Sequence, residues 1–242
     1  MRDMSDTDLV HFSPAVPLGV HDAVRSAPHF VRWRDGLVAR FDVRRIDVHD
    51  VIMFGPRVGF IMAVADARHD GKPVPGAALL RGDSVSVLLV LHCPGTAPLT
   101  VLTREARIPI ARPDLLALPA GMLDGGEFIS TALRELSEEV GTDLKVRQED
   151  LVLLDTVWLS PGGTDEAMAL YCADITVPTD VVRTLDGRHT GLPGEHENIH
   201  LHVLPLADLP HIGRTDAKTI LSYHLYMARR VRQNDAGADL SP

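Results

Sequence analysis

The chain has 242 residues, of which 45% are hydrophobic and 24% charged, and this composition is typical of a globular protein with a substantial core. The formal net charge of −9 argues against a nucleic-acid backbone or an anionic membrane as the principal partner, because no cationic surface dominates. The acidic balance leaves phosphate substrates open, since bridging metal ions can hold them in an acidic site.

The cysteines and the N-terminus bear on the cellular compartment. Cys93 and Cys172 both lie in apolar runs, which predicts buried free thiols and not a zinc site. The N-terminal residues lack the apolar segment of a signal peptide, and no apolar stretch approaches the roughly 20 residues of a membrane span. From these features we expect a cytoplasmic protein.

The first half of the chain predicts mostly strands. Residues 1 to about 30 are rich in Pro, Ser, His and Asp without periodicity, and we expect them to be loosely structured. Residues 61–68 predict a strand that ends in a turn around Asp70 and Gly71. The β-branched run at 84–92 is long enough for a buried strand, and another strand follows Pro94 and Gly95.

The second half combines helices with further strands. Over 128–140, Phe128, Leu136 and Val140 fall at helical spacing on one side, and Gly141 is placed to end the helix. Other apolar patterns predict strands at 151–159, 168–175 and 198–206 and helices at 179–185 and 216–233. Mixed strands with separated helices indicate an α+β or α/β/α layered fold.

Three carboxylates carry the clearest chemical signal. Glu135, Glu138 and Glu139 lie at i, i+3 and i+4, so a helix places them on one face within a few ångströms of each other. Such a cluster needs solvent, basic partners or cations, and hard oxygen ligands suit Mg²⁺ or Mn²⁺. The alternative is a solvated acidic helix face. The glycine-containing loop at 118–127 and the adjacent Arg134 favour the metal site.

The segment 118–141 resembles the Nudix box. The matching residues are Gly121, Glu127, Arg134, Glu135, Leu136, Glu138, Glu139 and Gly141. Two positions depart from the pattern. Six residues, one fewer than usual, separate Glu127 from Arg134, which leaves the role of Glu127 open, and Thr142 stands where an aliphatic residue usually closes the box.

The resemblance extends beyond the box, from about residue 50 to the C-terminal helix. Over this range the chain is similar to the plant-type ADP-sugar pyrophosphatases of the Nudix superfamily. It implies an α+β fold, a Nudix α/β/α sandwich with a mixed sheet and an N-terminal accessory strand region. The expected parts are an accessory region at 1–80 that contributes to a homodimer, a hydrolase domain at 81–232 and a disordered tail at 233–242. The implied reaction is Mg²⁺-dependent (or Mn²⁺-dependent) hydrolysis of ADP-glucose or ADP-ribose to a nucleoside monophosphate and a sugar phosphate.

The resemblance also assigns residues. It implies that the metal is bound by Glu135, Glu138, Glu139, Glu197 and the backbone carbonyl of Ala120. Glu195 is then the general base, and Glu135 and Glu139 are catalytic as well. Arg107 binds the diphosphate, and the nucleoside-sugar pocket is lined by Ser160, Pro161 and Glu166. Each loop assignment has a plain structural alternative. Residues 194–198 can be a polar hairpin, Arg107 a surface residue, and the Pro-Gly-Gly sequence a simple turn.

Other interpretations stay open at this stage. His196, His200 and His202 lie close together, but no third ligand at tetrahedral spacing is evident, so we expect solvent-facing histidines. A second enzyme hypothesis is a Nudix diphosphatase for a dinucleotide or coenzyme A. A hypothesis of another class is a non-catalytic sensor of sugar nucleotides, which the intact carboxylates and the absence of a helix-turn-helix sequence disfavour.

Overall fold

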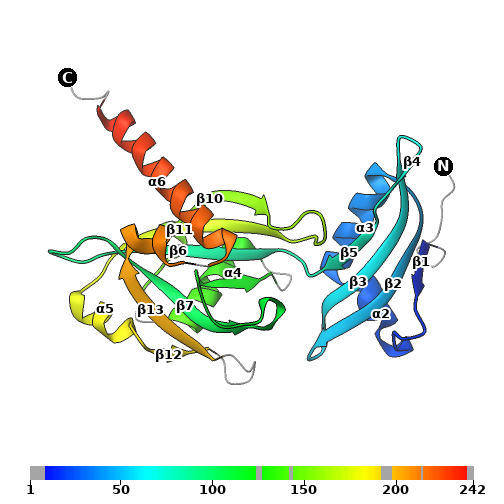
Figure 1. Ribbon diagram of the computed structural model, residues 1–242, viewed down its shortest axis with the longest axis horizontal. Coiled ribbons are helices and arrows are strands. Elements are labelled where there is room, and N and C mark those ends of the chain that lie inside the picture. The colour runs from blue at the N-terminus through cyan, green and yellow to red at the C-terminus, as the bar shows by residue number, and fades with distance from the viewer. Residues whose placement is uncertain (1–8, 124–126, 142–143, 192–197, 214, 239–242) are drawn as a thin grey trace. The chain divides into compact units, whose positions relative to one another are not determined.

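The computed structural model describes residues 9–123, 127–141, 144–191, 198–213 and 215–238. The chain divides into two compact units, whose helices and strands are labelled in Figure 1. The N-terminal unit comprises residues 1–83 and 158–167, and the C-terminal unit comprises residues 84–157 and 168–242.

The N-terminal unit contains one sheet of five strands with helices on one side. Its elements are β1 (Val10–Phe12), η1 (Leu18–Val20), α2 (His21–Ser26), α3 (Pro28–Arg40), β2 (Asp42–Phe54), β3 (Arg57–His69), β4 (Lys72–Val74) and β5 (Ala77–Leu80). The strand order is β1-β2-β3-β4, and β5 pairs with β3. Strand β1 is parallel to β2, and the other pairings are antiparallel. The expected turn after β3 is confirmed, because Asp70 and Gly71 both have positive φ between β3 and β4.

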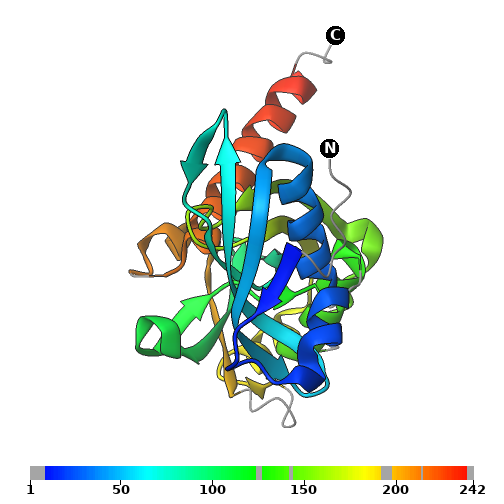
Figure 2. The ribbon, with the colours of Figure 1, turned by 90° about the vertical axis from the view of Figure 1, so that its right-hand side faces the viewer.

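Alternation along β3 decides which face of this sheet is covered. Ile61, Ala63 and Ala65 are buried against the core that Val24 and Phe30 of the helices complete. Figure 2 shows α2 and α3 along the same face of β2 and β3. The expectation of a loose segment before residue 30 is therefore wrong for residues 9–30. Burial of a few apolar side chains stabilises these short helices, which show no clear periodicity in the sequence.

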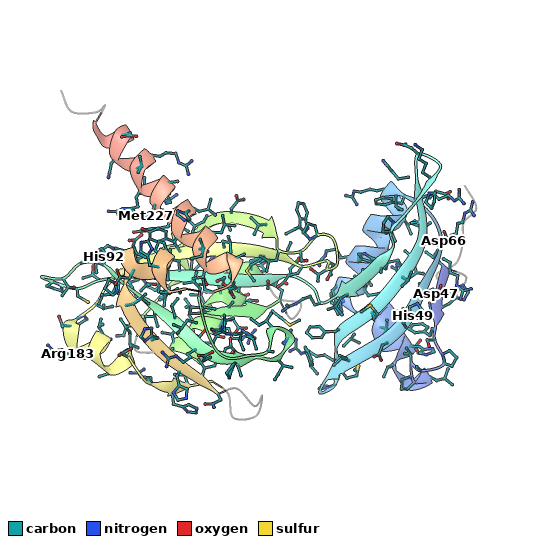
Figure 3. The ribbon with its side chains drawn as sticks, in the orientation of Figure 1. Asp47, His49, Asp66, His92, Arg183 and Met227 are labelled. Atoms are coloured by element: carbon teal, nitrogen blue, oxygen red, sulfur yellow. The ribbon has the colours of Figure 1, made fainter. Side chains whose placement is uncertain are left out.

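The opposite face of the N-terminal sheet is open. Ile52, Met62 and Val64 are 50%, 42% and 36% exposed. Figure 3 labels Asp47 and Asp66 on β2 and β3; Asp47 pairs with Val64 across the strands, and Asp66 follows Val64 by two positions. Polar and apolar side chains therefore share this open face.

The C-terminal unit contains the larger sheet. Its elements are β6 (Ser84–His92), β7 (Leu99–Arg107), η2 (Ile108–Ile110), β8 (Arg112–Ala117), β9 (Ala120–Met122), α4 (Phe128–Glu135), η3 (Leu136–Val140), η4 (Gln148–Asp150), β10 (Leu151–Trp158), β11 (Ala167–Thr176), α5 (Thr179–Leu185), β12 (His189–Thr190), β13 (Ile199–Pro205), η6 (Leu206–His211) and α6 (Ala217–Ala238). The strand order is β10-β11-β6-β7-β13-β12, with β8 beside β7 and β9 beside β6. Strands β11 and β6 are parallel, whereas β6 pairs with β7 and β9 antiparallel, so the sheet is mixed.

Both faces of this sheet are covered, as β6 illustrates. Val87 and Leu89 face a core that includes residues of α4, η3 and α5, and Leu88 and Val90 face a second core with Tyr226 of α6. A strand buried on both faces has a continuous apolar run, which is the pattern seen at 84–92. The arrangement confirms the α/β/α sandwich expected from the sequence.

Helix α6 is attached to the sheet by a polar contact and extends beyond its packed part. The Tyr226 hydroxyl donates to Asp174 at 2.7 Å, and the ring of His92, labelled in Figure 3, lies 2.7 Å from the same carboxylate oxygen. The helix continues to Ala238, so residues 233–238 are helical and the expected disordered tail is wrong there. Backbone hydrogen bonds within a helix do not require a packed face, which allows this extension. None of the helices in the described residues has the length and hydropathy needed to cross a membrane.

Candidate functional site

The box forms a helix that widens at its end. Helix α4 starts after Glu127, whose carbonyl accepts hydrogen bonds from the Thr131 N–H and the Ser130 hydroxyl. From Leu136 to Val140 the helix continues as a π-turn, closed by the Gly141 N–H on the Leu136 carbonyl at 3.1 Å. Gly141 has φ of +101°, which ends the helix where the sequence predicted its end. Single π-turns within helices are common at functional sites.

Glu135 packs directly on the backbone of Gly121. A Cβ atom at Gly121 would lie 1.8 Å from the Cδ atom of Glu135, so only glycine leaves room for this carboxylate. Gly121 lies in β9, which pairs with Val85 of β6. The glycine of the box therefore fixes where the Glu135 carboxylate can be.

Glu139 is the most buried carboxylate of the box. It is 4% exposed, and its Oε2 atom accepts a hydrogen bond from the Ala120 N–H at 3.1 Å. The Glu139 backbone is held as well, because its carbonyl accepts a hydrogen bond from the Thr190 hydroxyl at 2.6 Å. A charged group this deeply buried requires compensation by donors or cations. The structure thus brings Ala120, Glu135 and Glu139 together at β9.

Arg134 neutralises the outer carboxylates of the box. Its guanidinium donates to Glu135 at 2.6 Å and to Glu138 at 2.8 Å. Within the described residues, no three His, Cys, Asp or Glu side chains form a group that could hold a metal ion. The donors still fit a hard divalent cation, because they are carboxylate oxygens and one of them occupies a space that a Cβ at Gly121 would fill.

Arg107 lies at the end of β7, in the same unit as the box. Its side chain is 43% exposed and forms an ion pair with Glu105. Strand β7 also contacts η3, the π-turn of the box helix. Arg107 is therefore an accessible cation on a strand that touches the box.

The three expected pocket residues lie in the N-terminal unit. Ser160 and Pro161 are exposed, and the Ser160 carbonyl accepts hydrogen bonds from Gly163 and Thr164. Glu166 is buried, and its carboxylate lies 3.3 Å from a guanidinium nitrogen of Arg81.

Asp165, which the sequence did not single out, connects the segment 158–167 to the rest of the N-terminal unit. Its Oδ1 atom accepts hydrogen bonds from the N–H groups of Arg81 and Gly82 at 2.7 and 3.2 Å. Its Oδ2 atom lies 3.3 Å from Arg32, which also pairs with Asp83. The Leu79 N–H donates to the Gly163 carbonyl at 2.8 Å. Arg81 is 84 positions from Asp165, so no sequence spacing could have revealed the contact.

The histidines and the loop carboxylates complete the set of expected residues. His200 and His202 line a groove of about 370 Å³ with Arg104 and Asp186, and His202 lies 3.5 Å from the Asp186 carboxylate. Glu195, His196 and Glu197 lie outside the described residues.

Residues 80–223 match the NUDIX domain family. The chain is 37% identical to "Nudix hydrolase 14, chloroplastic" of Arabidopsis thaliana over 202 residues, 78% of this chain and 64% of that protein. It is 31% identical to "ADP-ribose pyrophosphatase" of Saccharomyces cerevisiae over 94 residues, 38% of this chain and 39% of that protein. The chain thus spans less than two thirds of the length of either relative. The expectation of a cytoplasmic protein is wrong, because the Arabidopsis relative is named as chloroplastic.

The fold is also shared with a solved structure. The chain aligns with a "Crystal structure of ADP compounds hydrolase" at a TM-score of 0.54, covering 80% of this chain and 96% of that chain. The sequences are 17% identical, so this likeness concerns the fold alone.

Proposed function

The chain belongs to the Nudix family, and from that premise we propose that it hydrolyses the diphosphate bond of a nucleoside-diphosphate sugar in an Mg²⁺-dependent reaction. The observation that carries the proposal is the pair of box carboxylates held at β9, with Glu135 packed on Gly121 and Glu139 bonded to the Ala120 N–H. The Gly121 backbone limits where the Glu135 side chain can lie, and the Ala120 N–H holds the Glu139 carboxylate, which supports a preorganised metal site. Hydrolysis is assigned to the domain at 81–232, with residues 1–80 as the accessory region.

The carboxylates of Glu135, Glu138 and Glu139 hold the metal, together with the Ala120 carbonyl and Glu197. Mn²⁺ is the expected substitute for Mg²⁺, because it accepts the same oxygen ligands. A bound divalent cation neutralises diphosphate charge and lowers the pKa of an attacking water. Arg134 would have to move away from Glu135 and Glu138 before these carboxylates could hold the metal, and because its side chain is 42% exposed, this movement towards water costs little free energy.

Two further residues act on the substrate in this proposal. Arg107 grips the diphosphate, because a planar guanidinium can donate two parallel hydrogen bonds to phosphate oxygens. Glu195 accepts the proton of the attacking water, and Ser160, Pro161 and Glu166 line the pocket for the nucleoside and sugar. The assignments of Glu195 and of the pocket loop rest on the family resemblance.

The names of the relatives narrow the substrate class. The yeast relative is named as an ADP-ribose pyrophosphatase and the structural relative as a hydrolase of ADP compounds. We accordingly propose an ADP-sugar, either ADP-ribose or ADP-glucose, as the substrate. The products are AMP and the corresponding sugar phosphate.

We also propose that the protein is a homodimer through its N-terminal region. The open face of the N-terminal sheet carries Ile52, Met62 and Val64 at 36–50% exposure, and clustered apolar side chains of this kind mark association surfaces. Analytical ultracentrifugation tests this directly. A monomer at micromolar concentration contradicts the dimer but leaves the hydrolysis proposal intact.

The hydrolysis proposal is tested by a substrate panel with resolved products. ADP-ribose, ADP-glucose, UDP-glucose, GDP-mannose, a dinucleotide and coenzyme A are incubated with the protein in MgCl₂, in MnCl₂ and in EDTA. We expect AMP and a sugar phosphate from an ADP-sugar, and no product in EDTA. Faster cleavage of the dinucleotide or coenzyme A identifies another Nudix diphosphatase. Binding of ADP-ribose without turnover in either metal overturns the enzyme proposal in favour of a sensor.

A further inference from the structure

Strand β12 contacts the box helix at its C-terminal end, far from it in sequence. The Thr190 hydroxyl donates to the Glu139 carbonyl at 2.6 Å across 51 positions of the chain. Two positions earlier, the guanidinium of Arg188 lies 3.0 Å from where a Cβ of Gly141 would be. Arg188, just before β12, and Thr190, in β12, therefore both reach the end of the box helix.

The carbonyl that Thr190 binds belongs to a helix end, where backbone carbonyls lack intrahelical partners. The Gly141 N–H, which follows the π-turn, bonds to the Leu136 carbonyl. The Thr190 hydroxyl therefore supplies a donor to the Glu139 carbonyl from outside the helix.

Glu139 is consequently held at two points. The Ala120 N–H fixes its carboxylate at 3.1 Å, and the Thr190 hydroxyl fixes its backbone carbonyl at 2.6 Å. Thr190 itself is anchored, because it pairs with the fully buried Ile199 of β13 and its β-branched side chain has few rotamers. A hydroxyl donor on strand β12 thus holds the backbone of a helix residue that the proposed function assigns to metal binding.

We propose that Thr190 is a positioning residue of the box, which holds the π-turn so that the Glu139 carboxylate is presented in the geometry that binds the metal. The inference rests on the proposed function of Glu139. Thr190 does not touch metal or substrate in this proposal. Its loss should therefore weaken metal binding, while saturating metal should restore turnover.

The test compares Thr190→Val, which keeps the shape but loses the donor, with Thr190→Ser, which keeps the donor. Binding of Mn²⁺ without substrate is measured by electron paramagnetic resonance, and kcat is measured at saturating Mg²⁺. One net hydrogen bond corresponds to about a three- to tenfold change in an equilibrium constant. We expect Thr190→Val to weaken Mn²⁺ binding by that factor, with kcat at saturating metal within about twofold of wild type, and Thr190→Ser to bind as wild type does.

Thr215→Val is the matched control. The Thr215 hydroxyl also donates to a backbone carbonyl, that of Leu116, at 2.6 Å in the same unit but outside the box. It should lower the melting temperature about as much as Thr190→Val and leave Mn²⁺ binding unchanged. If Thr190→Val does not fold, Thr190→Ala provides the variant without a donor.

The outcomes are distinguishable. Wild-type Mn²⁺ affinity in folded Thr190→Val or Thr190→Ala overturns the positioning role. Equal weakening in Thr215→Val also overturns it, because the effect is then general destabilisation. If the wild-type protein binds no Mn²⁺ and hydrolyses nothing, the proposed function itself fails, and the inference fails with it.

Discussion

Each unit of the protein holds an arginine between two carboxylates, and the two clusters are built differently. In the N-terminal unit Arg32 pairs with Asp83 and Asp165, which lie 51 and 133 positions away. In the C-terminal unit Arg134 pairs with Glu135 and Glu138, one and four positions away. Tertiary structure assembles the first cluster, whereas chain adjacency and one turn of helix assemble the second.

Asp165 and Glu138 have different kinds of hydrogen-bond partner, and this difference distinguishes a structural carboxylate from one that can bind a ligand. Asp165 binds backbone N–H groups of Arg81 and Gly82, which cannot leave without moving the chain. Glu138 of the box is instead paired with the side chain of Arg134, which is 42% exposed and can be replaced by a cation. Asp165 thus holds a loop in place, whereas the pairing of Glu138 with a movable side chain leaves this carboxylate available to a ligand.

The largest effect is expected when the buried box carboxylate is neutralised. Glu139→Gln keeps the size of the side chain but removes its charge, so metal binding and turnover should both fall, turnover by at least about 100-fold. Steady-state kinetics with ADP-ribose measure it. Glu149→Gln is the control, because Glu149 is a surface carboxylate paired with Arg147 in the same unit. Near-normal turnover in Glu139→Gln would contradict the assignment of the box carboxylates to the metal site.

A methyl group on Gly121 should have the next largest effect. In Gly121→Ala the new Cβ would overlap Glu135, so the carboxylate has to leave its place. We expect kcat/KM to fall at least about tenfold with a higher Mg²⁺ requirement. Gly19→Ala, where a Cβ meets nothing within 4 Å, should be neutral. Unchanged kinetics in Gly121→Ala would mean that Glu135 acts from another position.

A change at Asp165 should lower the stability of the protein and leave metal binding unchanged. Asp165→Asn leaves two N–H groups and Arg32 with a weaker acceptor, and we expect a loss of about 1–3 kcal/mol in the free energy of unfolding. Urea denaturation measures it, and Mn²⁺ binding should stay at the wild-type level. Asp35→Asn, on an exposed pair with Arg34, is the control. A loss of metal affinity in Asp165→Asn would contradict the separation of roles drawn above.

The smallest expected effect is a pH dependence of stability that arises from His29 in the N-terminal unit. Burial lowers the pKa of His29 below its ordinary value of 6.5, and its Nε2 atom has no hydrogen-bond partner among the described residues. The imidazole of His29 therefore binds a proton more tightly in the unfolded chain than in the folded protein. The contribution of neutral His29 to the free energy of unfolding is present above pH 6.5 and is lost as pH falls through the lowered pKa. Urea denaturation between pH 7.5 and 5 should show a steeper decline for wild type than for His29→Gln. His69→Gln, at an exposed site, should decline as wild type does, and parallel curves for His29→Gln and wild type would refute the assignment.

The sequence predicted what local periodicity encodes. The helix at 179–185 and the strand at 84–92 were placed at their observed bounds, the strand because a continuous, β-branched apolar run is typical of a strand that is buried on both faces. The box helix was also located, since Phe128, Leu136 and Val140 mark its buried side and Gly141 its end.

What the sequence could not predict depends on contacts between distant segments. The π-turn at Leu136–Val140 and the bond from Thr190 to Glu139 have no pattern in the residues themselves. The helices before Arg40 form because Val24 and Phe30 find a sheet to cover, which the sequence around them does not reveal. Asp165 appeared only as part of a turn, since its partners at 81 and 82 precede it by more than 80 positions.

The segment 158–167 gives the chain an unusual path. It belongs to the N-terminal unit although it lies in sequence between parts of the C-terminal unit, so the polypeptide passes from one unit to the other three times. Cleavage at any single peptide bond cannot separate two such units into independent fragments. A fragment starting at residue 84 would keep Gly163 and Asp165 but lose Leu79, Arg81 and Gly82, to which they bind. The two units are therefore interlaced in sequence, and deletion of residues 1–83 leaves the turn at 159–166 without the residues that it binds.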